Sequence, residues 1–356
     1  MARREKIQAL DLLLKDLCSS NVPFGGKVVV LGGDFRQTVP IVPKKSLQEV
    51  IEYSLVSSDL WPLFTRFRLT ENVRAKEDAE FAKFLLALGN GELQDEENAL
   101  VTLPDELALS STKWPPTLED LIQQVYPHIS MRQLESTFFE ERALLTPRNE
   151  DVDLINEKLI DQFYGDVSTY RSFHSIIDDS CNIYPVEFLN TLCPSGMSPH
   201  KLVLKENCPV ILLRNLDPST GLCNGTRLLC KKFMPNLILC EISTGFYKGE
   251  NVFIPRINLR PSGSESYPFQ FQRMQFPLKL CFAMTINKSQ GQTLREVGVY
   301  IREPCFSHGQ LYVALSRAKK ASSIKVLDEQ SLEANHKTPV VRNVVSYTLL
   351  KRAGII

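Results

Sequence analysis

The sequence predicts an α/β fold class with a small β-barrel, and three stretches carry that prediction. Residues 28–31 are aliphatic and mostly β-branched, which is typical of a central parallel strand, and a glycine-rich polar loop follows them. Residues 280–284 form a second short apolar run that leads into a polar loop and an expected helix. Between residues 202 and 259, short apolar runs alternate with turn residues, and this spacing predicts the barrel.

Helical spacing of apolar residues predicts most of the remaining elements. We expect helices where apolar residues recur at intervals of three and four, at residues 1–17, 46–57, 81–88 and 151–159. Residues 67–70 are strand-like. Residues 92–140 are acidic and interrupted by prolines, which predicts a surface connection with short helices. Asn224-Gly225 is the strongest hairpin signal in the chain.

Composition excludes several classes of protein. The 356 residues contain 41 Lys and Arg and 41 Asp and Glu, so the formal net charge is zero. A zero net charge argues against a protein whose binding to nucleic acid depends mainly on overall positive charge, but it is compatible with a local basic groove. The nine cysteines are irregularly spaced and include no C-x-x-C pair, so we expect neither a disulfide framework nor a metal site. We find no signal peptide and no apolar run long enough to span a membrane, and a reducing compartment is expected.

Two polar stretches near the carboxyl end are candidates for phosphate chemistry. Residues 285–293 read TINKSQGQT, and a strand that opens through such a loop offers backbone N–H groups, a hydroxyl and an ammonium group to an anion. Residues 312–318 read YVALSRA and place Arg317 among small residues, where its planar guanidinium group suits a phosphate oxygen. Either stretch alone is more often an ordinary loop or a surface arginine.

Taken together and in this order, the stretches resemble the last motifs of superfamily 1 helicases. TINKSQGQT followed by FSHGQLYVALSRA resembles the PIF (petite integration frequency) family of 5′-to-3′ DNA helicases, and in particular the eukaryotic branch that also occurs in rolling-circle transposons. GGDFRQTVP at residues 32–40 resembles the third helicase motif. LTENVRA at residues 69–75 and LLTPRNEDVDLIN at residues 144–156 extend the resemblance over nearly the whole chain.

The resemblance implies a set of site residues. Its catalytic residues are Gln37, which senses the γ-phosphate, and two phosphate-directed arginines, Arg74 and Arg317. Its nucleotide-binding residues are Gly33, Asp34, Gln37, Gly291, Gln292 and Arg317. Its DNA-binding residues are Pro147, Arg148, Asn149, Thr285, Asn287, Lys288, Ser289, Gln290 and His308. For His308 the alternative is a packing role, and we expect no catalysis by it.

The resemblance also implies a domain organisation. It predicts tandem RecA-like domains of the P-loop NTPase class, of which the first is incomplete, with an SH3-like barrel inserted in the second. The barrel is either a single-strand binding module or a scaffold. The predicted boundaries are residues 1–100 for the remnant of the first domain, 101–143 for the connection, 144–200 and 266–356 for the second domain, and 201–265 for the insert.

Two motifs that such a motor needs do not occur in the sequence. A phosphate-binding loop reads G-x-x-x-x-G-K-[S/T], but Val28 follows the one Gly-Lys pair, Gly26-Lys27, and Asn21 stands where the first glycine belongs. Residues 323–329 imitate a strand that ends in Asp-Glu, but they follow the Arg317 helix, where the family has a closing strand. We therefore expect an amino-terminally truncated helicase core that is inactive by itself.

Two hypotheses remain open at this point. The first is an ATP-dependent DNA helicase of DNA repair, recombination or telomere maintenance, with ATP and Mg²⁺ as cofactors of the complete protein and with Mg²⁺ ligands outside this chain. The alternative is a non-catalytic, nucleic-acid-binding remnant. For either, the resemblance implies single-stranded, forked or structured DNA as partner, no membrane, a monomer and a nuclear location, with the mitochondrion as the alternative.

Overall fold

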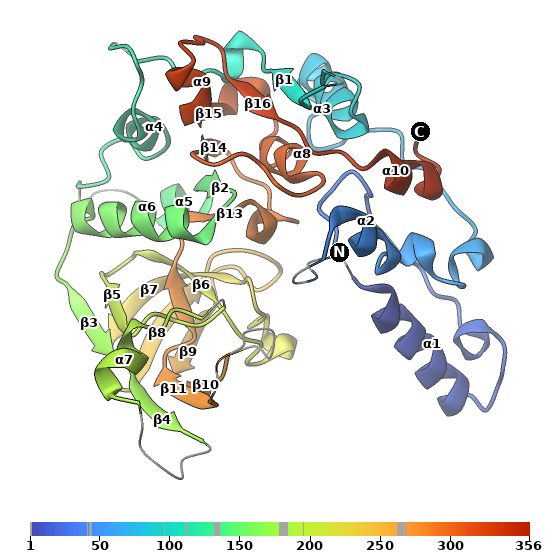
Figure 1. The fold of residues 1–356 in the computed structure, drawn as a ribbon. Helices are drawn as coiled ribbons and strands as arrows, with labels where there is room; N and C mark the ends of the chain where they lie inside the picture. Colours follow the sequence, from blue (N-terminus) through green and yellow to red (C-terminus); the bar gives the residue numbers. More distant parts are fainter. Residues whose placement is uncertain are drawn as a thin grey trace. The chain divides into compact units, whose positions relative to one another are not determined.

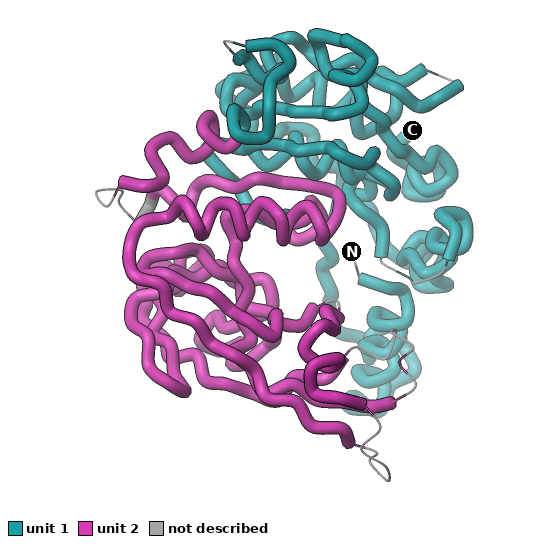
Figure 2. Tube along the Cα trace, turned by 60° about the vertical axis from the view of Figure 1, so that its left-hand side comes forward, with its two compact units in different colours: residues 1–121, 289–356 teal, residues 122–288 magenta. Residues whose placement is uncertain are grey.

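The chain folds into two compact units, which Figure 2 distinguishes by colour. The computed structural model describes residues 2–40, 42, 45–95, 97–111, 113–131, 136–177, 184–194, 196–261, 267 and 269–356. Unit 1 contains residues 1–121 and 289–356, and unit 2 contains residues 122–288. Unit 1 is therefore built from both ends of the chain. The four domain boundaries predicted from the sequence stay predictions.

Unit 1 consists of short helices and two small strand pairs (Figure 1). Its helices are α1 (Arg4–Leu17), α2 (Leu47–Glu52), α3 (Ala79–Asn90), α8 (Gln310–Leu315), α9 (Glu329–Glu333) and α10 (Tyr347–Ala353). Its strands are β1 (Leu100–Thr102), β14 (Glu296–Ile301), β15 (Ile324–Asp328) and β16 (Val340–Arg342). β14 and β15 pair in parallel, whereas β1 and β16 pair antiparallel. α4 (Leu118–Val125) lies where the chain passes from unit 1 to unit 2.

Capping residues fix where the helices of unit 1 begin and end. Asp78 precedes α3 and accepts a hydrogen bond from the Phe81 N–H group, while Gly91 ends α3 in the left-handed conformation. Ser346 caps α10 in the same way, with Gly354 at its other end. These signals explain why the predicted helix at residues 81–88 is confirmed as the longer α3.

The predicted central strand at residues 28–31 does not form, and this prediction is wrong for the described structure. The stretch is extended, but the exposed fractions of Val28 and Val30 are 94% and 89%, and no described strand pairs with it. The strand-like residues 67–70 likewise pair with no strand among the described residues, and Leu69 is 96% exposed. A strand exists only where a neighbour satisfies its backbone groups, so apolar composition alone does not produce one.

The polar loop after residues 28–31 is nevertheless held in place by a small core. Val39 follows the loop and packs with Val50, Ile51 and Val56 around α2, together with Leu349 from α10. This cluster joins the two ends of the chain. α2 ends earlier than the predicted helix at residues 46–57, because a separate 3₁₀ turn covers Leu55–Ser57.

Unit 2 combines a parallel strand pair with antiparallel sheets (Figure 1). Its helices are α5 (Ser136–Glu140), α6 (Asn149–Gln162) and α7 (Val186–Thr191). Its first strands are β2 (Arg142–Thr146), β3 (Ser168–Arg171), β4 (Phe173–Ile176), β5 (Lys201–Leu204), β6 (Pro209–Leu212), β7 (Arg227–Phe233) and β8 (Leu237–Ile242). The others are β9 (Asn251–Pro255), β10 (Ile257–Leu259), β11 (Phe271–Gln275), β12 (Leu278–Leu280) and β13 (Ala283–Thr285).

The region of the predicted barrel forms a five-stranded antiparallel sheet in the order β12-β6-β7-β8-β9. Its membership differs from the prediction, because β5 pairs with β3 and β10 pairs with β11, while β12 joins from outside residues 201–265. β6 and β7 pair antiparallel, but residues 213–226 connect them, and Asn224-Gly225 lies in a turn at the end of that connection, so the signal marks a turn and not a two-residue hairpin. Closure into an SH3-like barrel stays a prediction.

Two buried polar side chains hold the parallel pair of unit 2 in place. Asn156 on α6 accepts a hydrogen bond from the Ala283 N–H group and donates to the carbonyl groups of Leu280 and Ala283. Arg227 on β7 is 1% exposed and donates to carbonyl groups at the start of β2, including those of Glu140 and Arg142. Because a buried donor without a partner is costly, these bonds fix the position of β2 and β13.

The described residues contain no membrane-spanning helix, no metal-binding cluster and no disulfide bond. None of the helices in the described residues combines the length and hydropathy that crossing a bilayer requires. Among the same residues, no cluster of three or more His, Cys, Asp or Glu side chains is arranged to hold a metal ion. The described cysteines are free thiols.

Candidate functional site

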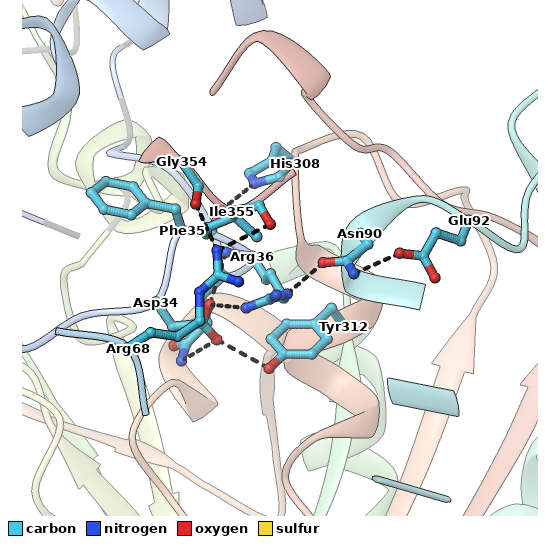
Figure 3. A network of polar contacts seen from close by, with 11 residues as sticks. Asp34, Phe35, Arg36, Arg68, Asn90, Glu92, His308, Tyr312, Gly354 and Ile355 are labelled. Carbon is cyan, nitrogen blue, oxygen red and sulfur yellow. Dashed lines mark hydrogen bonds and ion pairs between the residues drawn. The ribbon is translucent and has the colours of Figure 1, made fainter. Parts of the chain in front are cut away.

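The loop at residues 34–38 forms the centre of the candidate site in unit 1 (Figure 3). Both carboxylate oxygens of Asp34 accept hydrogen bonds: Oδ1 from the Arg36 N–H group at 3.0 Å, and Oδ2 from the Tyr312 hydroxyl at 3.0 Å and more weakly from Gln37 Nε2 at 3.4 Å. The Arg36 guanidinium group reaches α3, where its Nε donates to Asn90 at 2.7 Å. Asp34 therefore organises the loop, and its predicted contact with a nucleotide stays a prediction.

Gln37, the predicted phosphate sensor, directly contacts Gln290 in the loop at residues 288–291, which we call the KSQG loop. Gln290 Nε2 donates to Gln37 Oε1 at 2.8 Å, and the Thr38 hydroxyl donates to Gln290 Oε1 at 3.3 Å. These residues lie more than 250 positions apart in the sequence. The amide of Gln37 is thus engaged on both sides, by Asp34 and by Gln290.

The two predicted arginines lie close together beside this loop. Arg317 is 1% exposed, and its guanidinium group donates to the carbonyl groups of Val313 and Gln292 and to the Ser316 hydroxyl. Arg74 is half-buried and donates to the Thr293 hydroxyl at 3.1 Å and to the Ser316 carbonyl group at 2.8 Å. Each partner is neutral, so neither guanidinium group forms an ion pair with a carboxylate in the described residues.

The electrostatics follow from this arrangement. Burial is the largest cause that lowers the pKa of Arg317 to about 10, and the positive charge of Arg74 lowers it further. Burial also lowers the pKa of Arg74. Two cations that are partly desolvated and repel each other would be stabilised by an anion placed between them. The arrangement can therefore bind a phosphate group.

The glycines predicted to contact a nucleotide are the least constrained part of the site. Gly33 and Gly291 are exposed, and an added Cβ atom would meet nothing within 4 Å at either position. Gly291 has a φ of +84°, which a side chain would disfavour, so the turn after Gln290 needs glycine. Gln292 places its carbonyl group on Arg317 at 3.1 Å.

His308, predicted at the DNA channel, packs inside unit 1 instead. Its side chain has no exposed surface, its Nε2 lies 2.7 Å from the Phe35 carbonyl oxygen, and its Nδ1 accepts from the Ser346 N–H group at 2.9 Å. The imidazole thus ties the loop at residues 34–38 to the start of α10, and Figure 3 shows its contact with Phe35. A direct contact with DNA is not available to His308 in this conformation, which favours its packing role.

Unit 1 is expected to lose stability as the pH falls below about 6.5, the ordinary pKa of histidine. Burial is the largest cause that lowers the pKa of His308 in the folded chain, although the Phe35 carbonyl group and Asp34 oppose it. As the pH falls, His308 therefore becomes protonated in the unfolded chain at a higher pH than in the folded chain, and this difference favours unfolding. Urea unfolding between pH 8 and pH 5 should show this slope, and it should be shallower in His308→Gln. An equal slope in the variant would contradict the assignment.

Six further predicted DNA-binding residues lie at one edge of the parallel pair in unit 2, whereas Ser289 belongs to unit 1 and is buried. β13 and β2 run in parallel with Thr285 opposite Thr146, so the segments after both strands leave from the same edge. The first segment contains Pro147, which is buried, and Arg148 and Asn149, which are exposed. The second is a 3₁₀ turn over Ile286–Ser289 and contains Asn287 and Lys288. Carboxyl ends of parallel strands are where α/β folds bind ligands.

Lys288 has a second cation beside it. Its ammonium group donates to Asn224 in the β6–β7 connection at 2.9 Å. The side chain is exposed in part, yet burial around the ammonium group is the largest cause that lowers its pKa, and the positive charge of Arg214 adds to it. A phosphate group would relieve that repulsion, and the connection brings Asn224 and Arg214 to this edge. Sequence reasoning identified Asn224 as a turn signal only and did not identify Arg214.

Sequence reasoning also missed Tyr312 and Thr293. Both belong to stretches that were singled out, but Tyr312 touches Asp34 and Thr293 touches Arg74 through hydroxyl groups. A tyrosine five positions before an arginine is an ordinary helical residue. The sequence contains no signal for a hydroxyl whose partner lies 278 positions away.

Comparison with known proteins places the chain beside DNA helicases. A family model described as PIF1-like helicase matches residues 1–99, and one described as DNA helicase Pif1, 2B domain, matches residues 187–233. The ATP-dependent DNA helicases PIF1 of Xenopus laevis and Homo sapiens are each 26% identical, over 337 and 352 residues, and each match covers 92% of this chain and 45% of the relative. The chain thus spans less than half the length of these relatives.

A solved structure confirms the fold class. The Pif1 helicase from Bacteroides, in complex with ADP-AlF3 and ssDNA, is 21% identical and aligns with a TM-score of 0.64 over 99% of this chain and 72% of that chain. Such neighbours carry tandem RecA-like domains, and the likeness supports the predicted α/β architecture. At this identity the likeness concerns the fold alone.

Proposed function

We propose that the chain, which a family model described as PIF1-like helicase matches over residues 1–99, supplies part of an ATP-dependent DNA helicase core that couples ATP hydrolysis to translocation on single-stranded DNA and to duplex unwinding. One observation carries the proposal. Arg74 and Arg317 form a partly desolvated pair without a carboxylate partner in the described residues, beside a glutamine that contacts the KSQG loop. This donor set fits the terminal phosphate of a nucleoside triphosphate.

Each side chain has a role in that reaction. Arg74 is half-buried and would contact a phosphate oxygen first. Arg317 is buried under the loop that contains Gln292, and a phosphate oxygen would contact it only after that loop moves. Both guanidinium groups would stabilise charge that develops on the γ-phosphate, and the amide of Gln37 would exchange its bond to Gln290 for one to phosphate or water. Bound Mg²⁺ would neutralise phosphate charge.

The described residues do not fit a complete Mg²⁺ site. The carboxylate oxygens of Asp34 are engaged by the protein, and the sequence contains neither a phosphate-binding loop nor a suitable acidic pair. We therefore propose that ligands for the cation come from outside the described residues.

Single-stranded DNA is the proposed substrate of the unit 2 edge. Arg148, Asn149, Asn287 and Lys288 offer charged and neutral donors to successive phosphate groups. Forked or structured DNA, a monomeric state, a nuclear location and a role in DNA repair, recombination or telomere maintenance complete the proposal. Each of these rests on the family.

DNA binding through this edge predicts a salt-dependent affinity to which Lys288 contributes. Lys288→Ala should weaken binding of a fluorescein-labelled oligothymidine strand about fivefold at low salt and reduce the slope of log K against log salt by about 0.7, because one phosphate contact is lost. Fluorescence anisotropy at several salt concentrations measures both. Lys201→Ala, which removes an exposed lysine from β5 of the same unit, is the control. Equal effects of the two substitutions would contradict the assignment.

A second candidate is a nucleic-acid-binding protein that does not hydrolyse ATP. It is favoured by one observation, namely that no G-x-x-x-x-G-K-[S/T] occurs in the 356 residues. The two candidates differ in a complete transcript: an in-frame phosphate-binding loop upstream favours the helicase, and an unrelated upstream sequence favours the binding protein.

A further inference from the structure

We propose that Tyr312 is a positioning residue, whose hydroxyl acts through Asp34 and Gln37 to set the side chain of Gln290 for single-stranded DNA. The inference rests on the proposed function, because it takes Gln290 as a strand contact. It adds Tyr312 on α8 to the series of hydrogen bonds that runs through Asp34 and Gln37 to Gln290, which we call the path between the phosphate site and single-stranded DNA.

The first step of the path is the bond between Tyr312 and Asp34. The hydroxyl lies 3.0 Å from Asp34 Oδ2 (Figure 3). Burial is the largest cause that raises the pKa of Tyr312, and the Asp34 carboxylate raises it further, so the hydroxyl keeps its proton and donates it. Without this donor, Asp34 Oδ2 retains only the long contact of 3.4 Å from Gln37.

The second step passes through two amides. Gln37 Nε2 faces Asp34, which leaves Gln37 Oε1 to accept from Gln290 Nε2 at 2.8 Å. The Thr38 hydroxyl then donates to the other end of the Gln290 amide. Because an amide has one donor end and one acceptor end, the carboxylate decides which end of Gln37 points to Gln290, and so how Gln290 is oriented.

The packing of the tyrosine ring keeps the hydroxyl in place. A Cβ atom added to Gly89 on α3 would lie 2.9 Å from a ring carbon of Tyr312 and 2.8 Å from the Arg36 side chain, so the ring and the loop both press against this glycine. The Arg36 bond to Asn90 holds the other side of the loop. The hydroxyl therefore faces Asp34 without the freedom of a surface side chain.

Tyr312 lies on the helix that leads to the phosphate-directed Arg317. It lies on α8, one and a half turns before Arg317, which donates to the carbonyl groups of the loop that carries Gln290. A displacement of α8 thus changes the phosphate-directed arginine and the orientation of Gln290 together. Tyr312 is the residue through which that coupling can be cut without removing a charge.

A double-mutant cycle tests the inference on the 356-residue chain. Tyr312→Phe keeps the ring and removes the hydroxyl, and it should weaken binding of an oligothymidine strand about fivefold, which is the size of the net contribution of one ordinary hydrogen bond. In a Gln290→Ala background the same change should have almost no effect, because the path then ends before the strand. Tyr300→Phe, which removes a hydroxyl bonded to Glu329 elsewhere in unit 1, is the control and should leave the affinity unchanged.

Hydrogen exchange provides a readout that needs no DNA. In Tyr312→Phe the backbone amides of residues 34–38 should exchange several times faster, while those of β14 and β15 stay as in the wild type. Unchanged affinity, an effect that persists in the Gln290→Ala background, or unchanged exchange of the loop would each overturn the role of Tyr312. If the wild-type chain binds no strand at any salt concentration, the proposed function fails as well.

Discussion

Arg317→Ala should abolish ATP hydrolysis in the complete helicase and also destabilise the fold, by about 3 kcal/mol, because it removes a buried network of hydrogen bonds. The guanidinium group donates to the carbonyl groups of Val313 and Gln292 and to the Ser316 hydroxyl. These acceptors would stay buried without their donor. Loss of transition-state charge stabilisation should lower hydrolysis by about 10³-fold or more.

Substitution of Arg74 distinguishes the loss of hydrolysis from the loss of stability that Arg317→Ala combines. Arg74→Ala removes two hydrogen bonds at a half-buried position, so it should cost less than about 1.5 kcal/mol while it still removes one phosphate-directed charge. Urea unfolding gives the stability, and hydrolysis by the complete protein gives the rate. If Arg74→Ala and Arg317→Ala lowered the stability equally, the structural role of Arg317 would be wrong. If Arg74→Ala left hydrolysis unchanged, the phosphate site would be wrong.

Gly309→Ala is expected to destabilise unit 1 by about 3 kcal/mol, the sum of backbone strain and overpacking. Gly309 precedes α8 with a φ of +71°, and a Cβ atom would lie 2.2 Å from the Arg36 carbonyl oxygen and 2.8 Å from the Gln37 carbonyl carbon. The methyl group can be accommodated only if the loop moves away from α8. Thermal and urea unfolding measure the loss of stability.

Gly26→Ala is the matched control for that substitution. Gly26 also has a positive φ, +77°, but an added Cβ atom would meet nothing within 4 Å, so strain alone should cost about 1 kcal/mol. Equal losses in the two variants would mean that the loop at residues 34–38 does not press against Gly309. A larger loss in Gly309→Ala supports the packing on which the candidate site depends.

Local signals predicted the helices better than the strands. Apolar spacing predicts α3, and the structure confirms it and adds Gly91 as its left-handed cap, because spacing and a cap are properties of the segment itself. Residues 28–31 have the composition of a strand but lack a described partner, and a strand depends on another segment of chain. The same dependence explains why β12, outside the predicted insert, joins the five-stranded sheet.

Sequence motifs predict the main residues of the candidate site, and the structure adds the residues that contact and position them. Gln37, Arg74, Gln290 and Arg317 were expected from the resemblance, and the structure brings them together in unit 1. Tyr312 and the packing role of His308 depend on partners more than 270 positions away, and no periodicity reveals such a partner. Site residues with a motif were therefore predictable, whereas the residues that position them were not.

The most direct test of the account is ATP hydrolysis by the 356-residue chain with and without single-stranded DNA. We predict no stimulated turnover but salt-sensitive binding of the strand, because the arginines and Gln37 are present and the phosphate-binding loop is not in this sequence. Turnover that DNA stimulates and Arg74→Ala abolishes would contradict it, and would mean that another segment of the chain binds the triphosphate.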